Sequence, residues 1–386
     1  MTLEPGQRVA ILGAGCAGVS VAHRLLDRFP GIELHVFDSN TTPRHDRTWC
    51  FWRFPDMPEE SAITHRWDRV RIRTEQTDRV IDCGSTPYCH VPSDRFITRG
   101  LERIEARCSL HAGVAVNELS ERVDGVEIAF GPSDEAGADT RTFDFAFDGR
   151  PPQRVACRNS LVQHFVGHEL EFADDVFDPS VATLMDFTVD QSAGLHFMYV
   201  LPFSASRALV ESTYMTPSYT GADDYDANIA EYCRVRLGST PTECVRTEHG
   251  VLPMAAGHVP CRSTARVWQI GTRAGVGRAS TGYAFDAIQR DSINICNALA
   301  DGRPRPRPPR TRLLTVLDRL LISLLHARQS LGPSVFASLF ERAPSDAIIR
   351  FLSDRPKPSD IARVIAAVPA SPMLAHLLRS PRSVLP

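Results

Sequence analysis

The sequence predicts an α/β protein with a parallel-sheet nucleotide-binding domain, an antiparallel β-sheet substrate domain and a helical C-terminal region. Three observations carry this prediction: a strand-like run meets a glycine turn near the N-terminus, paired strand-like runs fill the middle, and apolar residues recur at helical spacing near the C-terminus. We expect the nucleotide-binding domain over 1–150 with a return segment over 246–300. The antiparallel sheet is expected over 151–245, and a basic linker with helices over 301–386.

The composition is that of an ordinary globular protein. Its 386 residues include 43 Lys plus Arg and 46 Asp plus Glu, so nothing global indicates nucleic-acid binding. Its 10 cysteines form no Cys-x-x-Cys pair, which indicates reduced cytosolic thiols and no zinc or dithiol site. The sequence shows no signal-peptide core and no apolar run long enough to span a bilayer.

The nucleotide-binding prediction rests on the Gly-x-Gly-x-x-Gly turn after the strand-like run Val9–Leu12. Gly13 permits the tight turn, Gly15 lets backbone N–H groups approach a pyrophosphate, and Gly18 lets the following helix pack closely on the sheet. A second strand ends at Asp38, whose carboxylate can accept from a ribose hydroxyl. Because the motif opens the chain, we favour FAD over NAD and predict a Rossmann-type FAD-binding domain.

Two later segments can lie near the same cofactor. A strand ending in Asp148-Gly149-Arg150 is one, although a plain surface turn explains it equally. The other follows the strand Arg266–Ile270, where Gly271–Gly275 and then Ser280–Tyr283 form turns before a helix that reaches Ala300.

The middle of the chain predicts an antiparallel hairpin. Phe197–Leu201 and Ala208–Tyr214 are strand-like and flank a turn. Alternation places Leu209, Glu211 and Thr213 on one face. The pattern favours a solvent-facing Glu211, because unpaired buried glutamates are rare, and a buried acid is the alternative.

Other features allow two interpretations each. Trp49, Phe51 and Trp52 are either core aromatics or the apolar wall of a substrate channel. His164 and His168 could share a helix face, but no further ligand completes a zinc pattern, so we expect ordinary polar contacts and no metal. The segment 302–312 predicts an exposed basic linker, and the apolar helix after it covers either the core or a membrane surface.

These motifs resemble the flavin-dependent lycopene cyclases of bacterial carotenoid pathways over nearly the whole chain. The matching blocks, besides the glycine turn, are Arg47–Trp52, Tyr88–Phe96, Asp148–Arg150, Gln163–Gly167, Leu184–Phe187, Tyr199–Ser204 with Ala208–Tyr214, His249–Pro253, Gly271–Gly275 with Ser280–Phe285, Leu339-Phe340 and Arg350–Leu352.

The resemblance implies a cyclisation of lycopene ends without net redox change, using reduced FAD with NAD(P)H as electron source. It maps the family's essential acid onto Glu211, which reverses the preference for a solvent-facing position, and leaves Asp186 and Glu169 as backup acids. Cofactor-binding residues are then expected at Gly13, Gly15, Gly18, Asp38, Arg47, Asp148, Gly271, Thr272, Gly275, Thr281 and Gly282. The apolar substrate implies peripheral attachment to the cytoplasmic face of the membrane.

Two other classes of protein compete with this interpretation. A flavin monooxygenase or polyene reductase shares the N-terminal motif, but such enzymes normally carry an Asp where this chain has Thr272. A non-catalytic flavin-binding protein predicts cofactor binding with no turnover.

Overall fold

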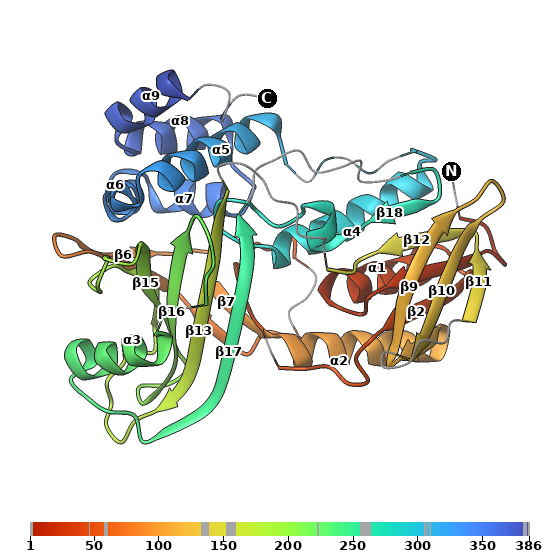
Figure 1. The fold of residues 1–386 in the computed structure, drawn as a ribbon, viewed down its shortest axis with the longest axis horizontal. Coiled ribbons are helices and arrows are strands. Elements are labelled where there is room, and N and C mark those ends of the chain that lie inside the picture. Colours follow the sequence, from red (N-terminus) through yellow and green to blue (C-terminus); the bar gives the residue numbers. More distant parts are fainter. Residues whose placement is uncertain are drawn as a thin grey trace.

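The computed structural model describes residues 3–45, 47–57, 61–132, 139–151, 160–221, 224–254, 264–304, 306, 308, 310–380 and 384. Figure 1 shows the nucleotide-binding part at one end, a tall antiparallel sheet at the other, and the C-terminal helices gathered above that sheet. The predicted fold class is confirmed.

Within the described residues, a parallel five-stranded sheet runs in the order β18-β12-β1-β2-β8. Alternate residues of β1 enter two different cores: Val9 and Ile11 face the helices, and Ala10 and Leu12 face a small second sheet. The elements are β1 (Arg8–Leu12), β2 (Glu33–Asp38), β8 (Ser109–Ala112), β12 (Phe145–Asp148) and β18 (Val267–Gln269), with helices α1 (Cys16–Arg28), α2 (Ser93–Ile104) and α4 (Phe285–Ala300) on one face and β9 (Val114–Glu121), β10 (Val126–Pro132) and β11 (Asp139–Phe143) on the other.

The described chain also forms a seven-stranded sheet in the order β17-β13-β16-β15-β14-β5-β6. Its strands are β5 (Arg69–Arg73), β6 (Asp78–Asp82), β13 (Leu161–Glu171), β14 (Val181–Asp186), β15 (Leu195–Pro202), β16 (Arg207–Thr216) and β17 (Glu243–Met254). The predicted hairpin is confirmed as β15 and β16. The boundary expected at residue 245 falls inside β17, which pairs with β13 from Glu243 to Met254.

The two faces of the large sheet have different neighbours. One face packs on helix α3 (Tyr225–Tyr232). The other packs on the C-terminal helices and on a three-stranded sheet of the described chain, β3-β7-β4. These elements are β3 (Thr48–Trp52), β4 (His65–Trp67), β7 (Tyr88–Pro92), α5 (Arg312–Ala327), α6 (Gly332–Arg342), α7 (Ser345–Leu352), α8 (Pro358–Ala367) and α9 (Ala370–Arg379).

The C-terminal region differs in detail from the sequence prediction. Helix α5 buries Leu314, Ile322 and Leu325 in the core, so its apolar face is mainly a core face. The basic linker is not uniformly exposed, because Arg310 is nearly buried, pairs with Asp354 at 3.1 Å and donates to two backbone carbonyls. In the described chain no single helix has the length and apolarity to cross a membrane; α8 and α9 pass that test only as a pair bent by 96°.

The histidine pair lies on a strand, not a helix. His164 and His168 both belong to β13, where residues four apart share a face. His164 contacts the hydroxyls of Tyr225 and Thr216, and His168 lies 3.1 Å from Asp226. Among the described residues, no group of three or more His, Cys, Asp or Glu side chains is arranged to hold a metal ion.

Candidate functional site

The glycine turn forms an open cradle at the start of α1. Gly13 has a φ of +96°, which favours glycine, and its N–H donates to the carbonyl of Phe37 at 2.7 Å. A Cβ on Gly18 would lie 1.8 Å from the Gly13 carbonyl oxygen, so only glycine allows this closure. A Cβ on Gly15, by contrast, would meet nothing within 4 Å. The helix N-terminus at Gly15 is therefore open in the way that a pyrophosphate requires.

Asp38 lies directly beside this turn. It ends β2, and its Oδ2 accepts from the Ala14 N–H at 2.6 Å while Oδ1 accepts from the Asn40 N–H at 2.8 Å. The carboxylate thus braces the turn from the neighbouring strand. This position fits the expected contact with a ribose.

The structure brings two later segments to the same place. Gly271 has a φ of +61°, and a Cβ there would lie 2.6 Å from the Cβ of Ala17. The run with Thr272 and Gly275 therefore packs on the first turn of α1. Gly149 donates to the carbonyl of Leu12 at 2.8 Å, which places Asp148 at the rim of the turn. The Asp148 carboxylate is already held by Arg150 and Arg273, so it shapes the rim more than it offers a free acceptor.

The remaining cofactor candidates lie elsewhere. Arg47 precedes β3, and its N–H donates to Ser93 Oγ. Thr281 and Gly282 belong to the turn before α4, where a Cβ on Gly282 would lie 3.4 Å from Gln163 Oε1 of β13. The turn with Thr281 and Gly282 therefore borders the large sheet rather than the glycine turn.

The predicted acid is buried on the inner face of the large sheet, the face toward the C-terminal helices. Strand pairing aligns Tyr199, Glu211, Gly167 and Glu248 in one row across β15, β16, β13 and β17. Glu211 is 6% exposed, and Thr213 Oγ1 donates to its Oε1 at 2.5 Å. The solvent-facing position that the pattern alone favoured is wrong, because strands flank Glu211 on both sides and other elements cover this face.

The surroundings of Glu211 favour its protonated form. Burial, followed by the charge of Glu248, raises the pKa of Glu211 to about 8, against the opposing effect of the Thr213 hydrogen bond. A carboxyl group in this state carries its proton at neutral pH. It can therefore act as a general acid.

Three tyrosine hydroxyls meet beside this acid. The Tyr88 oxygen lies 2.9 Å from that of Tyr199 and 3.2 Å from that of Tyr283. Burial raises the pKa of each phenol, so all three are neutral at ordinary pH. Trp52 packs against Tyr88 and Tyr283 with ring centres 4.9 Å and 5.4 Å away. None of these tyrosines was among the site residues predicted from the sequence, although each lies in a block that carried the resemblance.

The aromatic run Trp49, Phe51 and Trp52 divides between two cores. Strand β3 is buried on both faces, and alternation sends Trp49 and Phe51 toward Phe285 of the nucleotide-binding core. Trp52 points to the opposite core, the one shared by the large sheet and the C-terminal helices. Trp52 alone of this group borders the tyrosines.

Neither backup acid shares the environment of Glu211. Asp186 lies on the opposite face, where it accepts from Thr188 and Tyr232 and lies 3.6 Å from Arg73. Glu169 shares the face of Glu211, but Arg207 and Arg246 both pair with it. Both groups are satisfied carboxylates, which makes them poor candidates for delivering a proton.

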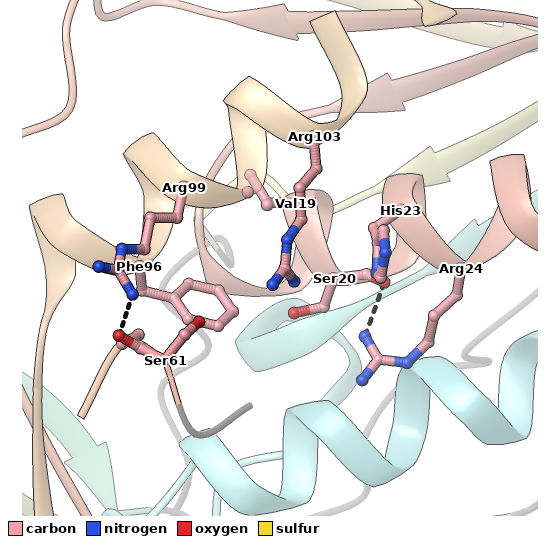
Figure 2. A pocket seen from close by; sticks show the side chains of 10 residues that line it. Val19, Ser20, His23, Arg24, Ser61, Phe96, Arg99 and Arg103 are labelled. Carbon is pink, nitrogen blue, oxygen red and sulfur yellow. Dashed lines mark hydrogen bonds between the residues drawn. The ribbon is translucent and has the colours of Figure 1, made fainter. Parts of the chain in front are cut away.

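Two hollows lie near these elements. Figure 2 shows the first between α1 and α2, lined by basic side chains such as Arg24, Arg99 and Arg103 and by Ser61, whose carbonyl accepts from Arg99. None of the residues that line this hollow belongs to the row that holds Glu211. The second is bounded by Cys50, Trp52 and Tyr283 and by Leu352 at the end of α7, so it borders the tyrosines.

Two solved structures share this fold over nearly their whole length. A geranylgeranyl bacteriochlorophyll reductase-like protein of Thermoplasma acidophilum matches with a TM-score of 0.63 at 10% identity, covering 99% of this chain and 100% of that one. HpxO of Klebsiella pneumoniae, complexed with FAD and uric acid, matches with a TM-score of 0.62 at 16% identity, covering 94% and 98%. The chain thus shares its fold with these two proteins, the second of which was solved with FAD bound.

The sequence comparisons are more specific. The model of the lycopene cyclase protein family matches residues 8–378, and the chain belongs to this family. It is 23% identical to a lycopene beta-cyclase of Pantoea ananas, covering 97% of this chain and 98% of that protein. It is 29% identical to a lycopene beta-cyclase of a Paracoccus species, covering 95% of each. The resemblance seen in the sequence is confirmed.

Proposed function

We propose that this protein is a lycopene cyclase that closes the acyclic ends of lycopene, or of a related polyene, into β-ionone rings without net redox change. The observation that carries the proposal is Glu211, a buried carboxyl that keeps its proton at neutral pH. Tyr199 is aligned with it on the neighbouring strand, the neutral phenols of Tyr88 and Tyr283 join Tyr199, and Trp52 packs on those two. The family match supports the same reaction.

Glu211 is the general acid of this mechanism. It delivers its proton to C2 of the terminal C1=C2 double bond, and the C5=C6 double bond attacks the C1 cation to close the ring. The C5 cation then loses the C6 proton, and the Glu211 carboxylate is the base that takes it up. An alkene is a very weak base, so the step requires a dry site and an acid of raised pKa.

The neighbours of Glu211 exclude water and favour a cation. Trp52 and Tyr88 offer π-faces, which attract positive charge. The phenols of Tyr88, Tyr199 and Tyr283 satisfy one another, so the wall contains polar atoms without a competing base. The hollow lined by Cys50, Trp52 and Tyr283 borders this wall, and we propose it as the entry for the polyene end.

The residues around the glycine turn fit FAD. The open N-terminus of α1 at Gly15 suits the pyrophosphate, Asp38 suits the adenosine ribose, and the turn Gly271–Gly275 packs against the same helix end. Reduced FAD held there would supply an electron-rich ring that favours a cation, and NAD(P)H is the proposed source of its electrons.

We also propose peripheral attachment to the cytoplasmic face of the membrane, because the substrate is a hydrocarbon. Leu374 and Leu378 of α9 are 57% and 81% exposed, and Ile365 of the preceding helix α8 is exposed as well. Arg363 and Arg379 lie on the same two helices. Exposed leucines next to basic residues are typical of a surface that rests on anionic lipid.

A FAD-dependent monooxygenase or polyene reductase is the second candidate, favoured by the fold shared with such oxidoreductases. It predicts a product whose mass changes by oxygen or hydrogen. A cyclase product has the mass of its substrate.

The substitution Glu211→Gln tests the acid. It keeps size and hydrogen bonding but delivers no proton, so we expect turnover of lycopene to fall by about 10²–10⁴-fold or more while FAD stays bound. Glu211→Asp shortens the reach by one methylene and should retain a trace of activity. Flavin absorbance of the purified variants separates lost chemistry from misfolding. Robust cyclisation by flavin-loaded Glu211→Gln would assign the acid to another group.

A further inference from the structure

A second glutamate faces Glu211 across a glycine. Strand β13 lies between β16 and β17, and its Gly167 pairs with Glu211 on one side and Glu248 on the other. A Cβ on Gly167 would lie 3.3 Å from both Glu211 Cβ and Glu248 Cγ. The two side chains therefore flank the place where a side chain at 167 would stand. Their strands are two spacings apart, about 9–10 Å.

The two carboxyl groups differ in their partners: Glu248 pairs with a cation, whereas Glu211 accepts from a hydroxyl. Arg246 donates to Glu248 Oε2 at 2.5 Å, and Thr48 Oγ1 donates to the same oxygen at 2.7 Å. Glu248 is only 3% exposed, so these charge-assisted bonds hold a buried carboxylate. In the described chain Glu211 has Thr213 as its hydrogen-bond partner and no cation in contact. Unequal environments of this kind separate the roles of paired carboxylates.

We propose that Glu248 is a positioning residue for the cyclisation: it is the ionised member of a carboxyl pair, and its charge keeps the proton on Glu211 until the alkene arrives. The inference rests on the proposed function and deepens it. Glu248 acts through Glu211 and need not touch the substrate. When Glu211 has released its proton, repulsion from Glu248 also makes the Glu211 carboxylate a stronger base for the C6 proton, so the same group returns to its starting state.

The other charged and titratable groups near the pair do not replace Glu248. Glu169, on the same face, is matched by Arg207 and Arg246. From the covering elements, Cys50 of β3 and the phenols of Tyr88 and Tyr283 face the site, with Tyr199 beside Glu211, and burial raises the pKa of all four. These four groups are neutral where Glu211 titrates. Glu169 pairs with two guanidinium groups, whereas Glu248 shares only Arg246 with it, and Glu248 is the carboxylate that stands across Gly167 from Glu211.

The test is the pH dependence of Glu248→Gln. Loss of this neighbouring charge should move the alkaline limb of kcat/KM for lycopene to lower pH by about one unit, which is a loss of about fivefold at pH 8 and about tenfold at higher pH. Glu248→Asp keeps the charge and should keep the wild-type limb. Glu243→Gln removes an exposed glutamate from the same strand and should change nothing. An unshifted limb in Glu248→Gln, whatever its maximal rate, overturns the proposal.

Two further measurements keep the test decisive. Infrared titration of the protonated carboxyl band, identified by its absence in Glu211→Gln, follows Glu211 without any turnover. A band that titrates one unit lower in Glu248→Gln supports the pair even if lycopene is not the substrate, and an unmoved band refutes it. If Glu248→Gln does not fold, Glu248→Ala with added formate replaces it: formate should restore the alkaline limb, and a limb insensitive to formate contradicts the proposal.

Discussion

The side chains that contact Glu169 and Glu211 decide whether each can act as an acid, more than the position of each on its strand does. Glu169 and Glu211 share one face of the large sheet on neighbouring strands. Glu169 meets two guanidinium groups, whereas Glu211 meets a hydroxyl. The first is a satisfied ion pair, and the second is an acid that holds its proton. A sequence pattern alone contains no information on such partners.

The raised pKa of Glu211 makes a prediction about stability. That pKa is about 8 in the folded chain against an ordinary 4.5, so the folded chain holds a proton that the unfolded chain has released. The free energy of unfolding of the wild type should therefore fall as pH rises from about 4.5 to 8. Glu211→Gln has no such proton, and its stability relative to wild type should rise by a few kcal/mol over this range, at about 1.4 kcal/mol per pKa unit.

Guanidinium unfolding of both proteins at pH 5, 6.5 and 8 measures this difference. Glu243→Gln serves as the control for general effects of removing a glutamate. A stability difference between Glu211→Gln and wild type that does not change with pH would contradict the raised pKa.

Among the elements, those built from neighbouring residues were the predictable ones. The strand β1, the glycine turn, the helix α1 and the acid that ends β2 follow each other within one short stretch, and each has its own local signal. The hairpin of β15 and β16 is equally local. Strand β3 was harder to predict, because both of its faces are buried and a run of aromatic residues does not show which core each enters.

The glycine turn allows a matched pair of substitutions. Gly15→Ala places a methyl group in open space, so we expect normal folding but weaker FAD retention, since the methyl occupies the approach of the pyrophosphate. Gly18→Ala places a Cβ against the Gly13 carbonyl, which no rotamer can relieve, so it should lower both the midpoint of thermal unfolding and FAD content. Flavin titration and thermal unfolding measure both effects. Full FAD affinity in Gly15→Ala would place the pyrophosphate elsewhere.

At the scale of the whole molecule, the candidate site is assembled from distant segments. Tyr88 comes from β7 of the three-stranded sheet, Tyr199 and Glu211 come from the large sheet, and Tyr283 comes from the turn before α4. Glu248 and Arg246 lie on an edge strand, and Thr48 joins them from β3. No local pattern announces that these residues meet. The family resemblance identified Glu211, but the tyrosines and the role proposed for Glu248 required the three-dimensional arrangement.

Membrane attachment is a property of the whole surface. We expect the protein to sediment with anionic vesicles in a salt-sensitive manner, because basic residues near anionic lipid contribute about 1 kcal/mol each. Replacing Leu374 and Leu378 with Ser should weaken this binding, since both are exposed apolar side chains of α9. Val123→Ser is the control, because Val123 is also an exposed apolar side chain but lies in the nucleotide-binding part of the molecule. Equal recovery in solution with and without vesicles would exclude the attachment.

The central claim is acid-catalysed ring closure without net redox change, and one measurement tests it most directly. The protein is equilibrated in D₂O with pre-reduced FAD and given lycopene for a single turnover, and the product is analysed by mass spectrometry and NMR. We expect a cyclic isomer with one deuterium at C2 of the ring formed in that turnover, without consumption of NAD(P)H. A product that has gained oxygen or hydrogen, with NAD(P)H consumed in proportion, would contradict it.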